Sequence, residues 1–467
     1  AQFHYLIPDS AGYLSWGRSL LWDGDVDFTN EYRAFGMIEA GAGIRFGSET
    51  PTGAPGNPFG MGTALMWMPF LMLSLCVSHV FLWFGQNVGT DGFTTGTLFA
   101  AHLGSWTCVL IGVVLVDAAV RAWRPRGTNN RLAVATACLA MPLPYYVWQL
   151  PSYSHAASMC TVAAVVFLTM QNRENATVRI AAWLGIAVGF AGLVRMQNLA
   201  FAWFPLCVLF GEYRRQRRLV AALSAFSLSC LLVFLPQLVA WRALYGAWLQ
   251  VPQGSDFLSF TWSSAAQVLG STRHGLVPTA PVVLVAAWLV LRRVTPQSGR
   301  VAGAIAGCFL LKWLANAVPV DWWAGWSFGA RRFCNLVPLL ALTLAVWEGR
   351  WARIGLVSLL ALNVVQWLRV ATGNLSGEGD PGWNGLWGSE FLAFLPKLPE
   401  AIFDLLQTPW GRLSVIAQPG TAPQIRPDPL ALLLLLFVLW VVVLLGLAHV
   451  GSRLLAAGSA RTGNSRG

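Results

Sequence analysis

Charged residues are scarce in this chain. Asp, Glu, Lys and Arg make up only 11% of its 467 residues, whereas 56% are apolar and the mean hydropathy is +0.56. Soluble globular domains carry about 25% charged residues. The composition therefore excludes a soluble globular protein and predicts an integral, polytopic membrane protein of the all-α class.

Cysteine pairs are lacking as well. The eight cysteines stand singly within apolar runs, without a CxxC motif or a regular spacing. This pattern excludes a disulfide framework and a cysteine-based zinc site. We interpret these residues as small buried hydrophobic side chains.

Long apolar runs, in contrast, are abundant. About 11 of them approach the roughly 17 to 25 residues that a membrane-spanning helix requires. They cover residues 98–120, 132–148, 155–171, 179–194, 196–211, 219–241, 278–292, 302–319, 333–347, 353–371 and 430–452. We therefore expect a bundle of about 11 spans in this chain.

Arginine is concentrated in the connections on one side of this bundle. These connections are residues 121–131, 172–175, 212–218, 292–300, 349–353 and the C-terminal tail, and they hold more than half of the 31 Lys and Arg. Cytoplasmic loops carry an excess of Lys and Arg. We place these connections in the cytoplasm, so that most acidic residues lie on the extracytoplasmic face.

The apolar run at residues 60–84 decides where the N-terminal segment lies. If this run crossed the bilayer, the acidic segment before it would be cytoplasmic. If it lies flat at the interface, as its central Pro69 and its Trp and His residues permit, residues 1–97 form one large extracytoplasmic loop. We prefer the second arrangement and expect one further span upstream of Ala1. The remaining divisions are the transmembrane bundle (98–371), a second extracytoplasmic loop (372–429), and the last span with a basic cytoplasmic tail (430–467).

The first loop contains the acidic stretch DGDVDFTNEY, residues 23–32. An EF-hand loop beginning at the first aspartate would need Gly at its sixth and Glu at its twelfth position, where this chain has Phe and Ala. A looser divalent-cation site formed by Asp25, Asp27 and Glu31 is one interpretation. A polar turn with a glycine at the bend is the other.

Asp9 precedes residues 10–22, whose apolar residues recur at the spacing of a short amphipathic helix lying on the interface. Two interpretations stay open. The carboxylate could cap the free amide groups of the first turn. Alternatively, it could act as a general base at the positive end of the helix, facing a cleft at membrane level.

Adjacent arginines on an outer loop run against the usual charge distribution of membrane proteins and need another explanation. Arg331 and Arg332 form such a pair in WWAGWSFGARRF (322–333), and Arg273 lies beside His274 in STRHGL (271–276). Guanidinium groups bind phosphate through charge and forked hydrogen bonds. We therefore expect an anionic ligand such as a lipid phosphate.

Three further ionisable residues interrupt apolar sequence. His155 begins a span, and Arg195 lies in the tight turn GLVRMQN (192–198). Each of these two is also a residue type found at a water boundary. Lys312 lies inside the span 302–319, so it is either functional or extends its amine to the interface.

Several segments together resemble one enzyme family. Asp9 with its helix, DGDVDFTNEY and NPFGMGTALMWMPF (57–70) look like the first outer loop of GT-C fold glycosyltransferases. LPSYSHA (150–156), GLVRMQN, STRHGL and WWAGWSFGARRF also look like segments of bacterial members. The similarity is greatest to bacterial integral-membrane relatives of the protein O-mannosyltransferases and the lipid A aminoarabinose transferase.

The resemblance implies a bacterial inner-membrane enzyme that takes a sugar from a polyprenyl-phosphate donor at an extracytoplasmic active site. It also implies interfacial helices in the first loop, and it makes Asp9 the catalytic base of a single inverting displacement. Our candidates for the donor phosphate are Arg331 and Arg332 first, followed by Arg195, Arg273, Lys312 and His155. The acceptor would be a glycan, a lipid or a protein, and no nucleic acid is expected. No cofactor is certain, although the acidic stretch is compatible with a divalent cation.

Two other functions compete with this one. A transporter or flippase of lipid-linked saccharides would also need arginines near the bilayer, but it predicts acids or broken helices at mid-membrane. A polymerase or ligase of such saccharides shares the outer arginines but not the N-terminal loop that begins with Asp9. The sequence does not identify the sugar or the acceptor.

Overall fold

The computed structural model describes residues 8–35, 50–292, 299–325, 328–375, 379–404, 426 and 428–444. Within these residues every regular element is a helix, and backbone pairing outside helices is limited to two isolated β-bridges and turns. The all-α class is therefore confirmed. The elements are α1 (Pro8–Arg18), the π-helical η1 (Ser19–Asp23), α2 (Thr29–Ala34), α3 (Gly62–Trp83), α4 (Thr95–Trp123), α5 (Asn130–Leu139), α6 (Leu143–Trp148), α7 (His155–Gln171), α8 (Val178–Val194), η2 (Met196–Ala202), α9 (Trp203–Arg215), α10 (Leu219–Tyr245), η3 (Ser255–Phe257), α11 (Trp262–Gly270), α12 (Leu276–Thr279), α13 (Val282–Arg292), α14 (Gly299–Ala317), η4 (Arg331–Leu336), α15 (Val337–Leu344), α16 (Arg350–Ala371), α17 (Gly382–Trp387), α18 (Ser389–Phe394), η5 (Leu395–Lys397) and a further helix at Leu430–Leu444.

Four helices, α3, α4, α10 and α16, are long and apolar enough to cross a membrane. α7, α8, α13 and the helix at Leu430–Leu444 are apolar but shorter. The expected spans 132–148 and 278–292 are each divided into two helices, with Pro142 and Pro281 at the breaks, because proline does not continue a helix. A membrane protein is thus supported, while the number of spans stays a prediction.

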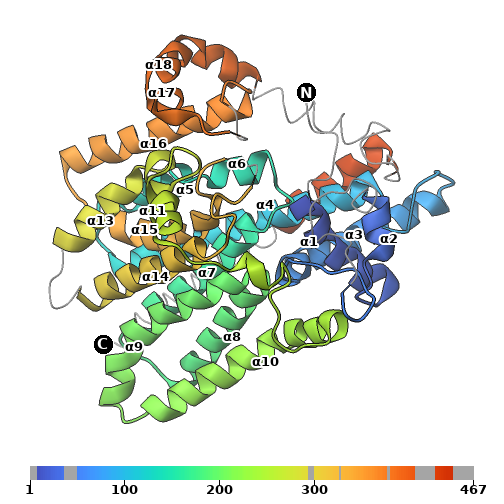
Figure 1. Ribbon diagram of the computed structural model, residues 1–467, viewed down its shortest axis with the longest axis horizontal. Helices are drawn as coiled ribbons and strands as arrows, with labels where there is room; N and C mark the ends of the chain where they lie inside the picture. Colours follow the sequence, from blue (N-terminus) through green and yellow to red (C-terminus); the bar gives the residue numbers. More distant parts are fainter. Residues whose placement is uncertain are drawn as a thin grey trace, which may run out of the picture.

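The run at 60–84, which we expect to lie flat, forms the continuous helix α3 with Pro69 inside it. It packs beside α4 (Figure 1), where Trp67 Nε1 donates to Ser105 Oγ at 2.9 Å. α3 has the length and composition of a membrane-crossing helix. Its flat placement therefore remains a prediction.

The N-terminal segment does not form a core of its own. Its buried residues in α1, α2 and α3 share one apolar cluster with Leu193 at the end of α8 and with Trp241 and Tyr245 at the end of α10. The segment 379–404, with α17 and α18, lies at an edge of the molecule beside α16 (Figure 1).

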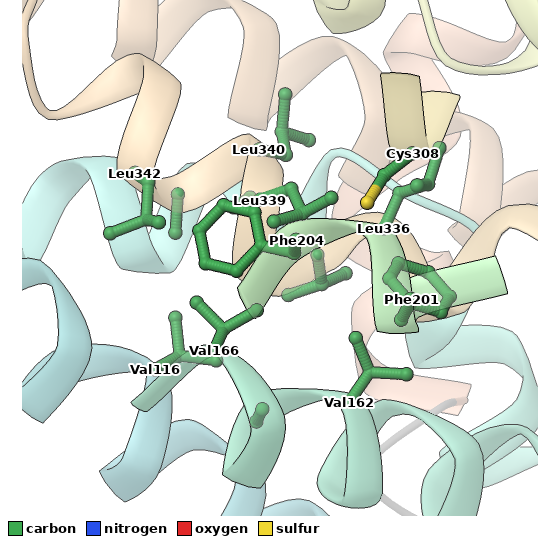
Figure 2. Close-up of a cluster of buried hydrophobic side chains, with 14 of the residues drawn as sticks. Val116, Val162, Val166, Phe201, Phe204, Cys308, Leu336, Leu339, Leu340 and Leu342 are labelled. Atoms are coloured by element: carbon green, nitrogen blue, oxygen red, sulfur yellow. The ribbon is translucent and has the colours of Figure 1, made fainter. Parts of the chain in front are cut away.

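The main apolar core lies where α4, α7, α9, α14 and α15 meet, together with η2 and η4. Figure 2 shows its centre, in which the rings of Phe201 and Phe204 are surrounded by aliphatic side chains from the other helices and by Cys308 of α14. Cys308 is fully buried, as the sequence predicts. The same prediction is confirmed for Cys108, Cys138, Cys160 and Cys334 but is wrong for Cys76, which is exposed, and for Cys207 and Cys230, which are half-buried. Since lipid is as apolar as these side chains, close packing is what holds such a core together.

α8 and α10 approach each other closely enough for their backbones to touch. Gly185 and Gly189 of α8 face α10: a Cβ on Gly185 would lie 2.2 Å from the carbonyl oxygen of Phe226, and one on Gly189 would lie 2.5 Å from that of Cys230. Small residues four positions apart allow this approach between membrane helices.

We expect Gly185→Ala to destabilise the protein by about 1–3 kcal/mol, because the added methyl group forces two packed backbones apart. Gly303→Ala on α14 is the matched control, since a Cβ there meets nothing within 4 Å. Thermal unfolding of both variants in nanodiscs is the measurement. Equal Tm values for the two variants would contradict the close contact.

Candidate functional site

One face of α14 changes from apolar to polar toward its C-terminal end. Its buried residues include Val301, Ala304, Cys308, Lys312 and Asn316, spaced three or four positions apart. Residues at this spacing share a helix face. The stripe therefore passes from the apolar core around Cys308 (Figure 2) to an amine and a carboxamide that are 0% and 1% exposed.

The polar end of α14 meets the turn that follows α8. Lys312 Nζ donates to Gln197 Oε1 at 3.1 Å and lies 6.0 Å from the centre of the Phe201 ring. Arg195 Nη1 lies 3.0 Å from Nδ1 of His155, the first residue of α7. Because a guanidinium can only donate, Nδ1 accepts this bond and the imidazole is neutral.

The beginning of η4 supplies two more cations. Arg331 Nη1 donates to Asp9 Oδ2 at 2.7 Å, and its guanidinium lies 5.3 Å from the centre of the Tyr153 ring. Arg332 Nη2 donates to Asp321 Oδ1 at 2.8 Å. The arginine side chains are 11% and 10% exposed, whereas those of Asp9 and Asp321 are 24% and 35% exposed. In both pairs the carboxylate is therefore the more accessible partner.

Together these residues form a cation cluster, defined as Arg195, Lys312, Arg331 and Arg332. All four charges act on the imidazole of His155, so they belong to one electrostatic environment. Among the described residues, Asp9 and Asp321 neutralise two of the four, and the other two bond to neutral groups. Buried charges normally occur with counter-charges. The surplus of positive charge is the property expected of an anion-binding site.

A network of neutral side chains adjoins the cation cluster. Asn335 Nδ2 of η4 donates to Asn198 Oδ1 of η2 at 2.7 Å, and Asn198 Nδ2 donates to Ser158 Oγ of α7 at 3.0 Å. These bonds tie together the three elements that carry Arg332, Arg195 and His155. The network therefore fixes the relative positions of the charged groups.

Arg273 joins the site through the segment that follows α14. Its guanidinium lies 4.6 Å from the centre of the Trp323 ring, and Nδ1 of His274 lies 2.8 Å from the Trp323 carbonyl oxygen. Backbone bonds from residues 257–259 to 318–320 hold the same segment in place. Arg273 thus contacts the segment that also carries Asp321.

The helix that begins with Asp9 is enclosed by protein. Every side chain from Ser10 to Ser19 is buried, which corrects our expectation of a helix with one face on the membrane interface. The reason is that its polar groups have protein partners: Ser152 Oγ donates to Ser10 Oγ, and Ser154 Oγ donates to the Tyr13 hydroxyl, both at 2.7 Å. Asp9 itself lies within the first turn of α1.

The acidic stretch at 23–32 does not converge on one point. Asp25 and Asp27 accept hydrogen bonds from neighbouring hydroxyl groups at 2.8 and 2.6 Å, as in a polar turn. Glu31 is fully buried and accepts a bond from Arg18 at 2.9 Å. Across the described part of the chain, no group of three or more His, Cys, Asp or Glu side chains is placed to hold a metal ion. A divalent-cation site therefore stays one interpretation of this stretch, without an assigned set of ligands.

Sequence reasoning missed several residues of the site, among them Asp321, Tyr153 and the two amides Asn316 and Asn335. Asn316 and Asn335 are neutral amides within apolar helical sequence, where a charged residue indicates a functional site more clearly than an amide does. The available signal for Asn316 was its spacing of four from Lys312, which places both on one face of α14.

Comparison of the chain with protein-family models, curated proteins and solved structures finds no match.

The buried carboxyl of Glu31 should make stability depend on pH. Burial raises the pKa of the Glu31 carboxyl from 4.5 to about 7. The hydrogen bond from Arg18 acts in the opposite direction and lowers this pKa, but by less. Between these values the folded protein holds a proton that the unfolded chain releases, so stability is highest below about pH 4.5 and falls as the pH rises to about 7. The loss is at most about 3 kcal/mol.

Thermal unfolding at pH 5 and pH 7.5 tests whether the Glu31 side chain causes the pH dependence of stability. Glu31→Gln should lose most of the difference in Tm between the two pH values, because the amide does not titrate. Asp27→Asn is the control and should keep it, since Asp27 lies at the exposed turn. A wild-type difference no larger than that of Glu31→Gln would contradict the assignment.

Proposed function

We propose that this protein is a membrane-embedded glycosyltransferase that moves a sugar from a polyprenyl-phosphate donor to an acceptor hydroxyl. One observation carries the proposal: a partly exposed carboxylate, Asp9, lies against a nearly buried arginine of a cluster that holds more positive than negative charge. A phosphodiester supplies the missing negative charge, and the carboxylate supplies a base. Both are needed at one place for glycosyl transfer from a lipid phosphate.

In the proposed reaction Asp9 accepts the proton of the acceptor hydroxyl. The hydroxyl oxygen forms a bond to the anomeric carbon while the bond from that carbon to the phosphate oxygen breaks. The electron pair of that bond goes to the phosphate, which leaves as polyprenyl phosphate. The configuration inverts, and Asp9 returns its proton to water.

The cation cluster stabilises the leaving phosphate. Charge grows on the phosphate oxygens as the bond breaks, so fixed cations favour the transition state over the bound donor. Arg331 donates to Asp9 Oδ2 in the structure at 2.7 Å, so this hydrogen bond occupies one oxygen of the carboxylate. A donor phosphate that takes over Arg331 would therefore also release Asp9 for catalysis.

The proposed location is the bacterial inner membrane, with the active site on the extracytoplasmic face. This placement rests on the arginine-rich connections, which are expected in the cytoplasm. The partners are then the lipid-linked donor, the bilayer and a glycan, lipid or protein acceptor.

Asp9→Asn and Arg331→Ala should separate chemistry from donor binding. We expect Asp9→Asn to slow transfer by about 10²–10⁴-fold, because a general base is lost. Donor affinity should be kept or increased, because a neutral amide competes less with the phosphate for Arg331. Arg331→Ala should weaken donor affinity by about 10- to 100-fold, because charge-assisted hydrogen bonds are lost. Arg121→Ala, at an exposed helix end with a side-chain exposure of 56%, is the control and should change neither.

The measurements are thermal shift in nanodiscs with a panel of polyprenyl-phosphate sugars, and transfer of radiolabelled sugar to acceptors in total membranes. Full transfer by Asp9→Asn would place the base elsewhere. Unchanged affinity in both Arg331→Ala and Arg332→Ala would remove the phosphate assignment. Movement of intact lipid-linked saccharide across vesicles without sugar transfer would favour a transporter.

We expect transfer to survive a strong chelator, because fixed cations already provide the positive charge that the leaving phosphate needs. The measurement compares sugar transfer before and after EDTA treatment and dialysis. Loss of transfer that Mg²⁺ or Mn²⁺ restores would assign part of this charge to a bound ion.

A further inference from the structure

A buried carboxamide without a partner lies one helical turn from the cation cluster. Asn316 is 1% exposed, and among the described residues neither its Nδ2 nor its Oδ1 has a hydrogen-bond partner. Buried polar groups are nearly always paired, and leaving both ends of an amide unpaired is costly. The unpaired carboxamide of Asn316 therefore needs a polar ligand or another specific explanation.

The position of Asn316 indicates which ligand its carboxamide would bind. It follows Lys312 by four residues on the buried face of α14, about 6 Å further along the helix. Further unpaired buried atoms lie on η4, which packs against α14 through Phe333 and Phe309: Nε of Arg331, Nη1 of Arg332 and Oδ1 of Asn335. Unpaired donors and acceptors thus lie on the two elements, α14 and η4, that carry Lys312, Arg331 and Arg332. The sugar attached to a phosphate held by these side chains would be near them.

The chemistry of the amide matches a neutral sugar. A carboxamide offers two N–H donors and an acceptor oxygen, which suits hydroxyl groups that both donate and accept. The surrounding charge disfavours an ammonium group: Arg195, Arg331 and Arg332 lie at the site, and its two carboxylates, Asp9 and Asp321, are paired with arginines. Like charges repel most strongly where water is excluded.

We propose that Asn316 is a specificity-determining residue that hydrogen-bonds hydroxyl groups of the transferred sugar, and that this sugar is uncharged rather than an amino sugar. The inference rests on the proposed function and narrows it to one substrate class. It departs from the aminoarabinose donor that the family resemblance would also allow.

Three kinds of probe distinguish binding of the sugar from binding of the phosphate. They are polyprenyl phosphate without a sugar, the neutral-sugar donors polyprenyl-phosphate mannose and polyprenyl-phosphate glucose, and the amino-sugar donor polyprenyl-phosphate aminoarabinose. With the full chain in nanodiscs, we expect a neutral-sugar donor to bind about 10-fold or more tightly than either other probe. Asn316→Leu, similar in volume, should reduce that affinity to the value for polyprenyl phosphate and leave polyprenyl phosphate binding unchanged.

The ligand-free Tm distinguishes a binding role from a structural one. Replacing an unpaired buried amide with an apolar side chain is neutral or stabilising, so Asn316→Leu should keep or raise Tm. Asn363→Leu on α16 is the matched control, since Asn363 is 4% exposed but already donates to the Leu359 carbonyl at 3.2 Å. It should leave the affinities for all three probes unchanged.

The outcomes distinguish the two proposals. Folded wild-type protein that responds to none of the probes would overturn the proposed function and this inference with it. Binding of polyprenyl phosphate that neither neutral sugar strengthens, or that Asn316→Leu weakens equally, would overturn this inference alone. Tighter binding of the aminoarabinose donor would overturn it as well.

Discussion

The ion pair between Arg331 and Asp9 is the interaction on which the rest of the structure depends. It joins residues 322 positions apart in the chain and thereby attaches the N-terminal helix to the beginning of η4. An arginine that is only 11% exposed needs a counter-charge, and α1 supplies it. The burial of α1, its hydrogen bonds to Ser152 and Ser154 just before α7, and the apolar cluster it shares with the end of α10 hold that carboxylate in this position.

The elements of the site have a common plan. α7, α14, η2 and η4 all contribute to the apolar core, and each carries its polar residues at the end where the cation cluster lies. The packed core below leaves these side chains little freedom to move. A charged group held in place before the substrate arrives stabilises developing charge without the cost of reorganisation, so the core and the cluster work as one unit.

The sequence was a good guide to the helices and to the charged residues. Every expected span contains helix in its described residues, because apolar runs of this length have few other stable conformations in lipid, although only four described helices are long and apolar enough to cross a membrane. Four of the proposed phosphate-binding residues lie in one cluster with Asp9 and His155. The pairing of Arg331 with Asp9 could not be predicted, since it depends on how distant segments pack. Nor could the enclosure of α1, because an amphipathic pattern alone does not say whether water or protein covers the polar face. Asn316 went unnoticed because its importance lies in the absence of a partner, which only the folded structure reveals.

The contact between α8 and α10 bears on how a lipid could reach the site. Helices whose backbones touch at Gly185 and Gly189 leave no room for a hydrocarbon chain between them, and they can separate only by losing that contact along its length. α8 and α10 therefore act as a closed wall on that side of the bundle. In the proposed function, the tail of a lipid-linked donor therefore reaches the cation cluster along a boundary other than the one between α8 and α10.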